Sequence, residues 1–349
     1  MSSLAITPLR RAYRPVVLLL ATLVAACDRN PAAPEATSRP MQPAVSQLII
    51  PDTRLPTLPP TFDGSAFYPI DVNRAAQQQF GFLATAVMVQ DHLYGWKASV
   101  GGQLYGIDMQ RAVEMQYGSG YVLAAIGVAA YDWRAVRWSE LNNRVIPVMP
   151  VASEYFWNVS AVRSGLANLK TVLVSIQNWY DLRAGQTFHY TLPLIVPLQS
   201  TLNAAQWNAL SAATSDSDHR WDLMNAAIDD YRRSYPRPNS AQKTIIVPFT
   251  GASQDVWLGA ASTDGRYAVA PPRASSLVCP SSGTLDYRCA DATYAVGHEL
   301  GHIFGLQHSC DAYPSDAACT SSIMQVGKPW NAILLPGEIA TLTPQVFFW

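Results

Sequence analysis

The sequence has little charge of either sign, and its charges nearly cancel. Charged residues make up 14% of the 349 residues, and 24 Lys and Arg stand against 25 Asp and Glu, for a formal net charge of −1. No cluster of basic residues follows the extreme N-terminus. Such a chain has no long-range field that would attract nucleic acid, so we expect no nucleic acid among its partners.

Cysteine is also scarce, and no two cysteines have the C-x-x-C spacing of a cysteine-based zinc knot. Apart from Cys27, the cysteines form two short-range pairs, and such pairs favour disulfides in an exported protein. Local pairing predicts the bonds Cys279–Cys289 and Cys310–Cys319. Four cysteines permit three connectivities, and the sequence does not choose among them.

The N-terminus lacks an apolar run long enough for a mature membrane span. Three arginines precede eleven apolar residues, Val16–Ala26, and Cys27 follows them. This pattern predicts a signal peptide over residues 1–26, and VAAC at 24–27 resembles a bacterial lipobox, in which the cysteine is lipidated. An ordinary cleaved signal with a chance cysteine is the alternative. The lipobox predicts an exported protein of the bacterial cell envelope, attached to the membrane by its N-terminal lipid only.

The chain after Cys27 divides into three parts. Residues 27–60 are rich in Pro, Ala, Ser and Thr, which is typical of a tether. Residues 61–140 alternate short apolar segments with glycine turns and predict a small β-rich accessory domain or pro-region, with a helix near 72–80. The whole sequence, with 49% apolar and 14% charged residues, fits a compact globular protein, and because the pattern changes from about Asn143 we expect a separate domain over residues 141–349.

Residues 141–349 alternate between strand-like and helix-like patterns, which predicts an α/β (α+β) fold with a mixed sheet packed against helices. We expect strands at 144–151, 187–198, 243–249, 255–261 and 266–272, and helices at 160–182, 203–213, 218–235 and from about 291.

Three of the six histidines are concentrated in HELGHIFGLQH, residues 298–308. On a helix, His298 and His302 lie on one face about one turn apart and can bind a single cation. Gly305 can end the helix and turn the chain so that His308 reaches the same cation. Three imidazoles and one open position predict one catalytic Zn²⁺, with Glu299 beside a metal-bound water as the base. The alternative is a helix whose histidines are satisfied in the core.

The predicted chemistry is hydrolysis of an amide bond in a protein or peptide substrate. Zinc would polarise the scissile carbonyl, while Glu299 takes a proton from the attacking water and passes it to the leaving amine.

The motif resembles the signature of the metzincin zinc peptidases, and the segment SSIM at 321–324 is similar to their methionine turn. The resemblance implies that Met324 is a hydrophobic floor below the zinc and not a ligand. The segment LLPGEIATL, 334–342, is similar to the start of the C-terminal helix in the matrixin branch. The resemblance to metzincins also suggests that RYAVAPP, 266–272, is the edge strand that holds an extended substrate.

The sequence departs from matrixins in two ways. It has no cysteine between Asp28 and Val278, which excludes a cysteine-switch propeptide, and the Asp- and His-rich loops for structural zinc and calcium are missing before the motif. Two other functions stay open: a cell-surface binding lipoprotein that retains a zinc-peptidase fold, and a zinc hydrolase with a non-peptide substrate. Among the remaining histidines, we expect His92 and His219 at the surface and His189 in a structural role.

Overall fold

The computed structural model describes residues 67–191, 195–213, 221–251, 259–276, 287–325 and 332–348. All of them belong to one compact unit, Pro34–Trp349. The predicted signal peptide, the lipidated Cys27 and the tether 27–60 lie outside the described residues. Within the described ranges, no helix is both long and apolar enough to span a bilayer.

A five-stranded sheet forms the centre of the C-terminal part, with the strand order β10-β11-β9-β7-β8. The pairs β11–β9, β9–β7 and β7–β8 are parallel, and β10–β11 is antiparallel. The sheet is therefore mixed, as predicted. Its strands are β7 (Arg144–Val151), β8 (Val196–Gln199), β9 (Gln242–Ile246), β10 (Ala260–Ala261) and β11 (Tyr267–Val269).

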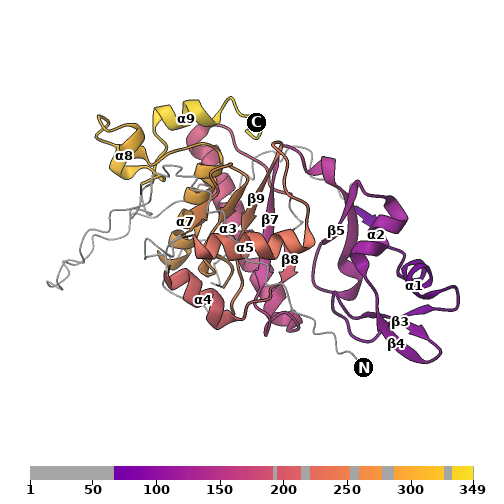
Figure 1. Cartoon of the computed structure of the whole chain (residues 1–349). Helices are drawn as coiled ribbons and strands as arrows, with labels where there is room; N and C mark the ends of the chain where they lie inside the picture. Colours follow the sequence, from indigo (N-terminus) through magenta and orange to yellow (C-terminus); the bar gives the residue numbers. More distant parts are fainter. Residues whose placement is uncertain are drawn as a thin grey trace, which may run out of the picture. The chain divides into compact units, whose positions relative to one another are not determined.

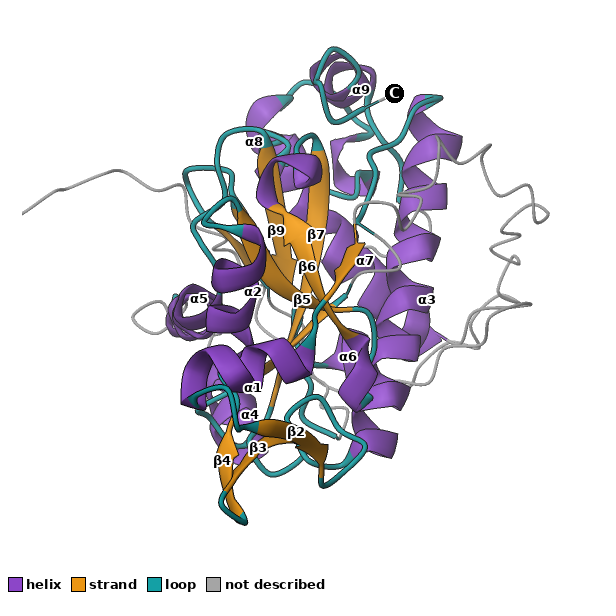
Figure 2. Cartoon of the chain, turned by 90° about the vertical axis from the view of Figure 1, so that its right-hand side faces the viewer, coloured by secondary structure: helices purple, strands orange, loops and turns teal. Residues whose placement is uncertain are grey.

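Alternation along β7 places its side chains in two different cores. Val145 and Met149 belong to a hydrophobic cluster with helices α3 (Val159–Ala184) and α7 (Tyr287–Ile303). Ile146 and Val148 point to the other face and join a cluster with α5 (Asp222–Ser234) and α4 (Ala204–Ala213). Figure 2 shows α3 and α7 on one side of β7 and β9, and α5 on the other. The coarse α+β class is confirmed.

Short elements complete this part of the chain. They are α6 (Arg273–Ser276), α8 (Ser309–Ala312), α9 (Pro336–Leu342), and 3-10 turns at Trp138–Leu141 and Cys319–Ser321.

Three sequence predictions for residues 141–349 are corrected. The segment 266–272 does not form the edge of the sheet, because β11 lies between β9 and β10, and β10 is the edge strand. Among the described residues of the predicted strand 187–198, regular strand structure is confined to β8, and Phe188 and Tyr190 form isolated bridges. The motif helix α7 begins at Tyr287, about one turn earlier than expected near 291.

Residues 67–137 are a tandem repeat that the sequence analysis missed. YPIDVNRAAQQQFG at 68–81 and YGIDMQRAVEMQYG at 105–118 are identical at seven of 14 positions, and a shift of 37 takes Tyr68 to Tyr105. The first copy folds as β1 (Phe67–Pro69), α1 (Val72–Phe80), β2 (Thr85–Met88) and β3 (Trp96–Val100). The second folds as β4 (Gln103–Gly106), α2 (Met109–Tyr117), β5 (Tyr121–Ala125) and β6 (Trp133–Arg137), with a 3-10 turn at Ala130–Asp132. Helix α2 was not predicted, so this region is less β-rich than expected.

The two repeats are interlocked, because each sheet takes its first strand from the other copy. Strand β1 pairs with β6, and β4 pairs with β3 in the equivalent register. The helices exchange matching contacts: Gln79 bonds the backbone N–H and carbonyl of Asp108, and Gln116 does the same at Asp71. The two copies therefore form one folded unit and do not fold as two separate units.

The second repeat packs onto the C-terminal part. Val122 and Val136, from β5 and β6, share a cluster with Ile146, Val148 and Leu198. Strand β5 contacts β8, and Figure 1 labels both strands. At the equivalent positions of the first repeat the sequence has Thr85 and Ser99, which fits a sheet face that is more open to solvent.

His92 lies at this junction, and the expectation that it is a surface residue was wrong. Its side chain is 1% exposed. The backbone N–H of Tyr94 donates to Nδ1, so Nε2 carries the proton and donates to the carbonyl of Phe156 at 2.8 Å. The polar sequence around His92 hid this role, because its partner is a carbonyl 64 residues away. His189 is buried beside Gln177, as expected of a structural residue, and His219 lies outside the described residues.

Candidate metal centre

Helix α7 carries the first two histidines, His298 and His302, one turn apart. Two glycines on the same helix let it approach its neighbours closely. A Cβ on Gly297 would lie 2.3 Å from Ile176 on α3, and a Cβ on Gly301 would lie 2.3 Å from the sulfur of Met324. Tyr180 on α3 also donates from its hydroxyl to the carbonyl of Gly297 at 2.9 Å. The helix is therefore held tightly against α3 and the segment around Met324.

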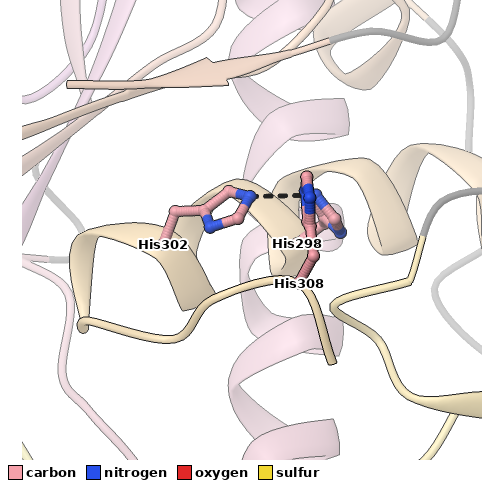
Figure 3. A group of neighbouring side chains, drawn as sticks. All are labelled: His298, His302 and His308. Atoms are coloured by element: carbon pink, nitrogen blue, oxygen red, sulfur yellow. Dashed lines mark hydrogen bonds between the residues drawn. The ribbon is translucent and has the colours of Figure 1, made fainter. Parts of the chain in front are cut away.

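The structure brings His298, His302 and His308 together. One ring nitrogen from each lies within 4.8 Å of the others, and the Nε2 atoms of His298 and His302 are 3.1 Å apart. Figure 3 shows the three rings converging, two from the helix and one from the segment beyond its end. Two nitrogens bound to one tetrahedral zinc at about 2.0–2.1 Å would be separated by about 3.3 Å.

Backbone carbonyls orient the two helical imidazoles. Nδ1 of His298 lies 2.8 Å from the carbonyl oxygen of Ile323, and Nδ1 of His302 lies 2.9 Å from that of Leu306. If each Nδ1 carries the proton and donates to its carbonyl, each Nε2 keeps a lone pair aimed at the common centre.

Burial keeps these imidazoles neutral at physiological pH. Burial, the largest cause, together with the neighbouring imidazoles lowers the pKa of His298 to about 3 and that of His302 to about 4, while the bonds to the carbonyls of Ile323 and Leu306 act in the opposite direction. The pKa of His308 is also lowered, mainly by burial, with Asp311 acting in the opposite direction. Neutral imidazole is the form that binds a metal, so no proton has to be removed first at neutral pH.

The end of α7 is fully capped, and this fixes the turn that leads to His308. Gly305 has a φ of 85°, and its N–H donates to the carbonyl of His302. The N–H of Leu306 donates to the carbonyl of Gly301. This is a Schellman motif, as the glycine predicted. The last two carbonyls accept from side chains of distant elements: Lys243 reaches that of Ile303, and Gln345 reaches that of Phe304.

The chain around His308 is anchored by a buried carboxylate that the sequence analysis did not identify. Glu338 on α9 is 1% exposed. It accepts hydrogen bonds from the hydroxyls of Ser309 and Ser322 and from the backbone N–H of Leu335. One acidic side chain thus joins the residue after His308, the segment before Met324 and the start of α9.

A disulfide closes the same segment. Cys310 and Cys319 are bonded, which confirms one of the two predicted pairs. Cys279 lies outside the described residues and Cys289 is described only in its backbone, so the 279–289 pair stays a prediction. Asp311, within the closed loop, lies 3.8 Å from Nδ1 of His308.

Met324 packs against the turn of α7 between His298 and His302. Its side chain is fully buried, and its sulfur faces Gly301. The residue before it, Ile323, supplies the carbonyl that orients His298. On the same face of α7, Tyr294 donates to the carbonyl of Gln325, which ties the segment after Met324 to the helix.

Glu299 is buried beside the histidines, at 5% exposure. Burial raises the pKa of its carboxyl to about 8, because no charge in the described part of the chain compensates for desolvation. A dication held by the histidines would favour the carboxylate and counter this shift. Glu299 extends from α7 toward the sheet, where it meets Gly259 just before β10.

The donor set fits a catalytic zinc ion. His298, His302 and His308 present three neutral nitrogens and no thiolate, and three protein ligands leave a further coordination position. Glu299, the neighbour of His298 on α7, supplies a buried carboxylate, a group that can transfer protons.

Comparison with known proteins found only weak structural similarity. No family model matches the chain, and no curated protein matches it. Crystal structures of wild type OgpA from Akkermansia muciniphila, in two crystal forms, match with TM-scores of 0.37 and 0.36 at 17% and 16% identity. Each match covers 59% of this chain and 62% of OgpA.

Proposed function

We propose that the protein is a zinc-dependent metalloendopeptidase with a metzincin-like catalytic domain over residues 141–349. The observation that carries the proposal is the convergence of three neutral imidazoles, from His298, His302 and His308, beside the buried carboxylate of Glu299. The HELGHIFGLQH motif, followed by SIM at 322–324 and LLPGEIATL at 334–342, makes the resemblance strongest to the matrixin branch.

Zinc bound by the histidines would supply a Lewis acid that polarises the substrate carbonyl and acidifies water. The chain's own residues supply the rest. Carbonyls of Ile323 and Leu306 hold two imidazoles in the ligating orientation, and Glu299 accepts the proton of the attacking water at its carboxylate and delivers it to the leaving amine. The edge strand β10, which contacts α7, offers its backbone to an extended peptide.

The location and the substrate belong to the same proposal. The apolar run before Cys27 and the VAAC sequence support export and attachment to a bacterial envelope membrane through a lipid on Cys27. The substrate is a protein or peptide, because the edge strand β10, in contact with the helix of His298 and His302, suits an extended backbone better than a compact small molecule.

Digestion of casein and of a peptide library, with and without a chelator, tests this function against its alternatives. A peptidase cleaves internal peptide bonds, stops when zinc is removed and resumes when one equivalent of zinc is restored. A binding lipoprotein would take up zinc without cleaving any peptide. A zinc hydrolase of another class would leave peptides intact and cleave small esters or amides in a chelator-sensitive way.

A further inference from the structure

Gly259, immediately before the edge strand β10, lies against the side chain of Glu299. A Cβ built on Gly259 would lie 2.5 Å from Cγ and 2.8 Å from Cδ of Glu299. The same Cβ would lie 2.6 Å from the carbonyl oxygen of Val269 on the neighbouring strand. Real Cβ atoms do not approach other atoms so closely, so any side chain here would displace Glu299, the strand or both.

Conformational freedom does not account for this glycine. Its φ lies outside the left-handed region, unlike those of Gly251, Gly265 and Gly305. Beside a strand, glycine costs backbone entropy and provides no side chain to pack. The close approach of another group is the remaining physical reason for glycine at this position.

Glu299 has few other constraints. Its carboxylate makes no hydrogen bond within the described ranges, although it is 5% exposed. Packing must therefore hold its side chain in place, and Gly259 supplies the contact on the sheet side. Gly297 and Gly301, on the same helix, face Ile176 and Met324 instead.

We propose that Gly259 is a positioning residue for Glu299, so that the edge strand sets the location of the base. This inference rests on the proposed function and adds a coupling to it. A substrate that pairs with β10 would bind the strand that directly follows Gly259, so strand pairing and the position of the base would be coupled through Gly259. A displacement of about 1 Å in such a group can cost about 10²-fold in rate.

The kinetic test compares Gly259→Ala with Gly106→Ala. A Cβ on Gly106 in β4 meets nothing within 4 Å, and its φ is ordinary, so this control adds a methyl group without a contact. We expect Gly259→Ala to lower kcat by about 10²-fold, with KM within about threefold and one zinc per chain. Gly106→Ala should match the unaltered protein. An unchanged kcat in Gly259→Ala would overturn the proposal.

A melting cycle with Glu299→Ala tests the contact without any need for activity. Glu299→Ala removes Cγ and Cδ, the two atoms that the new methyl group would meet. Gly259→Ala should lower the melting temperature in the unaltered protein and much less in the Glu299→Ala background. An equal loss in both backgrounds would mean that the carbonyl of Val269 alone requires the glycine, and the proposal would fall.

The two tests also separate this inference from the proposed function. If the unaltered, zinc-loaded protein cleaves no peptide, the proposed function fails. The melting cycle still decides whether Gly259 sets the position of Glu299.

Discussion

The hydroxyl oxygen of Ser309 lies 2.6 Å from Oε1 of Glu338, to which it donates a hydrogen bond. Ser309 directly follows the third candidate ligand, whereas Glu338 comes from the C-terminal helix 29 residues later. Ser322 donates to the same oxygen at 2.7 Å. The buried carboxylate thus holds the approach of His308 and the segment before Met324 in a fixed relation.

Replacing Glu338 with Gln should weaken zinc binding about 10–100-fold, as the loss of outer hydrogen bonds to a metal site typically does. The amide group cannot accept all three bonds in the same geometry, so the free energy of unfolding should also fall by about 1–3 kcal/mol. Zinc titration and denaturant unfolding measure the two effects. Thr341→Ala, which removes an exposed hydroxyl from the same helix, is the control. Unaltered zinc affinity in Glu338→Gln would show that the carboxylate serves α9 alone.

The disulfide Cys310–Cys319 should stabilise the same segment. The two cysteines are separated by 9 positions in the sequence, and the loop that they close lies between His308 and the segment before Met324. Replacing both cysteines with Ser should cost about 2–3 kcal/mol in unfolding free energy, because the unfolded chain gains freedom. Zinc affinity should fall as well, since Ser309 and Cys310 lead directly from His308. A double variant with undiminished affinity would contradict the second expectation.

The tandem repeat at 67–137 should remain in the active protein. Val122 and Val136 share a buried cluster with Ile146 and Val148, and directly after the repeat the carbonyl of Trp138 accepts from the side-chain amide of Gln242. Removal of the repeat would expose this apolar cluster to water. Mass measurement of the species that retains zinc and activity should find residues 67–137 attached. A stable, active species that begins near residue 141 would show instead that they are a pro-region.

His92 should make stability depend on pH. Burial lowers its pKa below the ordinary 6.5, while the bond to Phe156 and the charge of Asp91 act in the other direction. As the pH falls below about 6.5, His92 takes up a proton in the unfolded chain before it does so in the folded chain. The stabilisation that neutral His92 provides is therefore present above that pH and lost below it. Gln at position 92 can still donate to Phe156 but does not titrate. The unfolding free energy of the His92→Gln variant should fall less between pH 7 and pH 5 than that of the unaltered protein. Equal losses of unfolding free energy in the two proteins would refute this.

The sequence predicted the cluster of three histidines better than the residues that support it, because the histidines are close in the sequence and the supporting residues are not. His298, His302, Gly305 and His308 lie within one helix and its capping turn, where spacing alone determines which side chains meet. Glu338 acquires its role from serines 16 and 29 residues away, which no local pattern encodes.

The errors have the same origin. The order of short strands in a sheet depends on long-range pairing, so 266–272 was placed at the edge that Ala260–Ala261 occupies. Burial of His92 likewise depends on Phe156, far along the chain. The repeat could have been found from the sequence, because Tyr68–Gly81 and Tyr105–Gly118 align without a gap.

The most direct test measures metal content beside peptidase rate in Glu299→Gln and His302→Ala. Glutamine keeps the size of residue 299 but cannot take up a proton, so zinc should stay near one per chain while hydrolysis falls by at least about 10²–10⁴-fold. His302→Ala should lose both zinc and activity, because two imidazoles hold the ion less firmly. Loss of zinc from Glu299→Gln, or full activity in that variant, would contradict the assignment of Glu299 as the base beside a three-histidine zinc site.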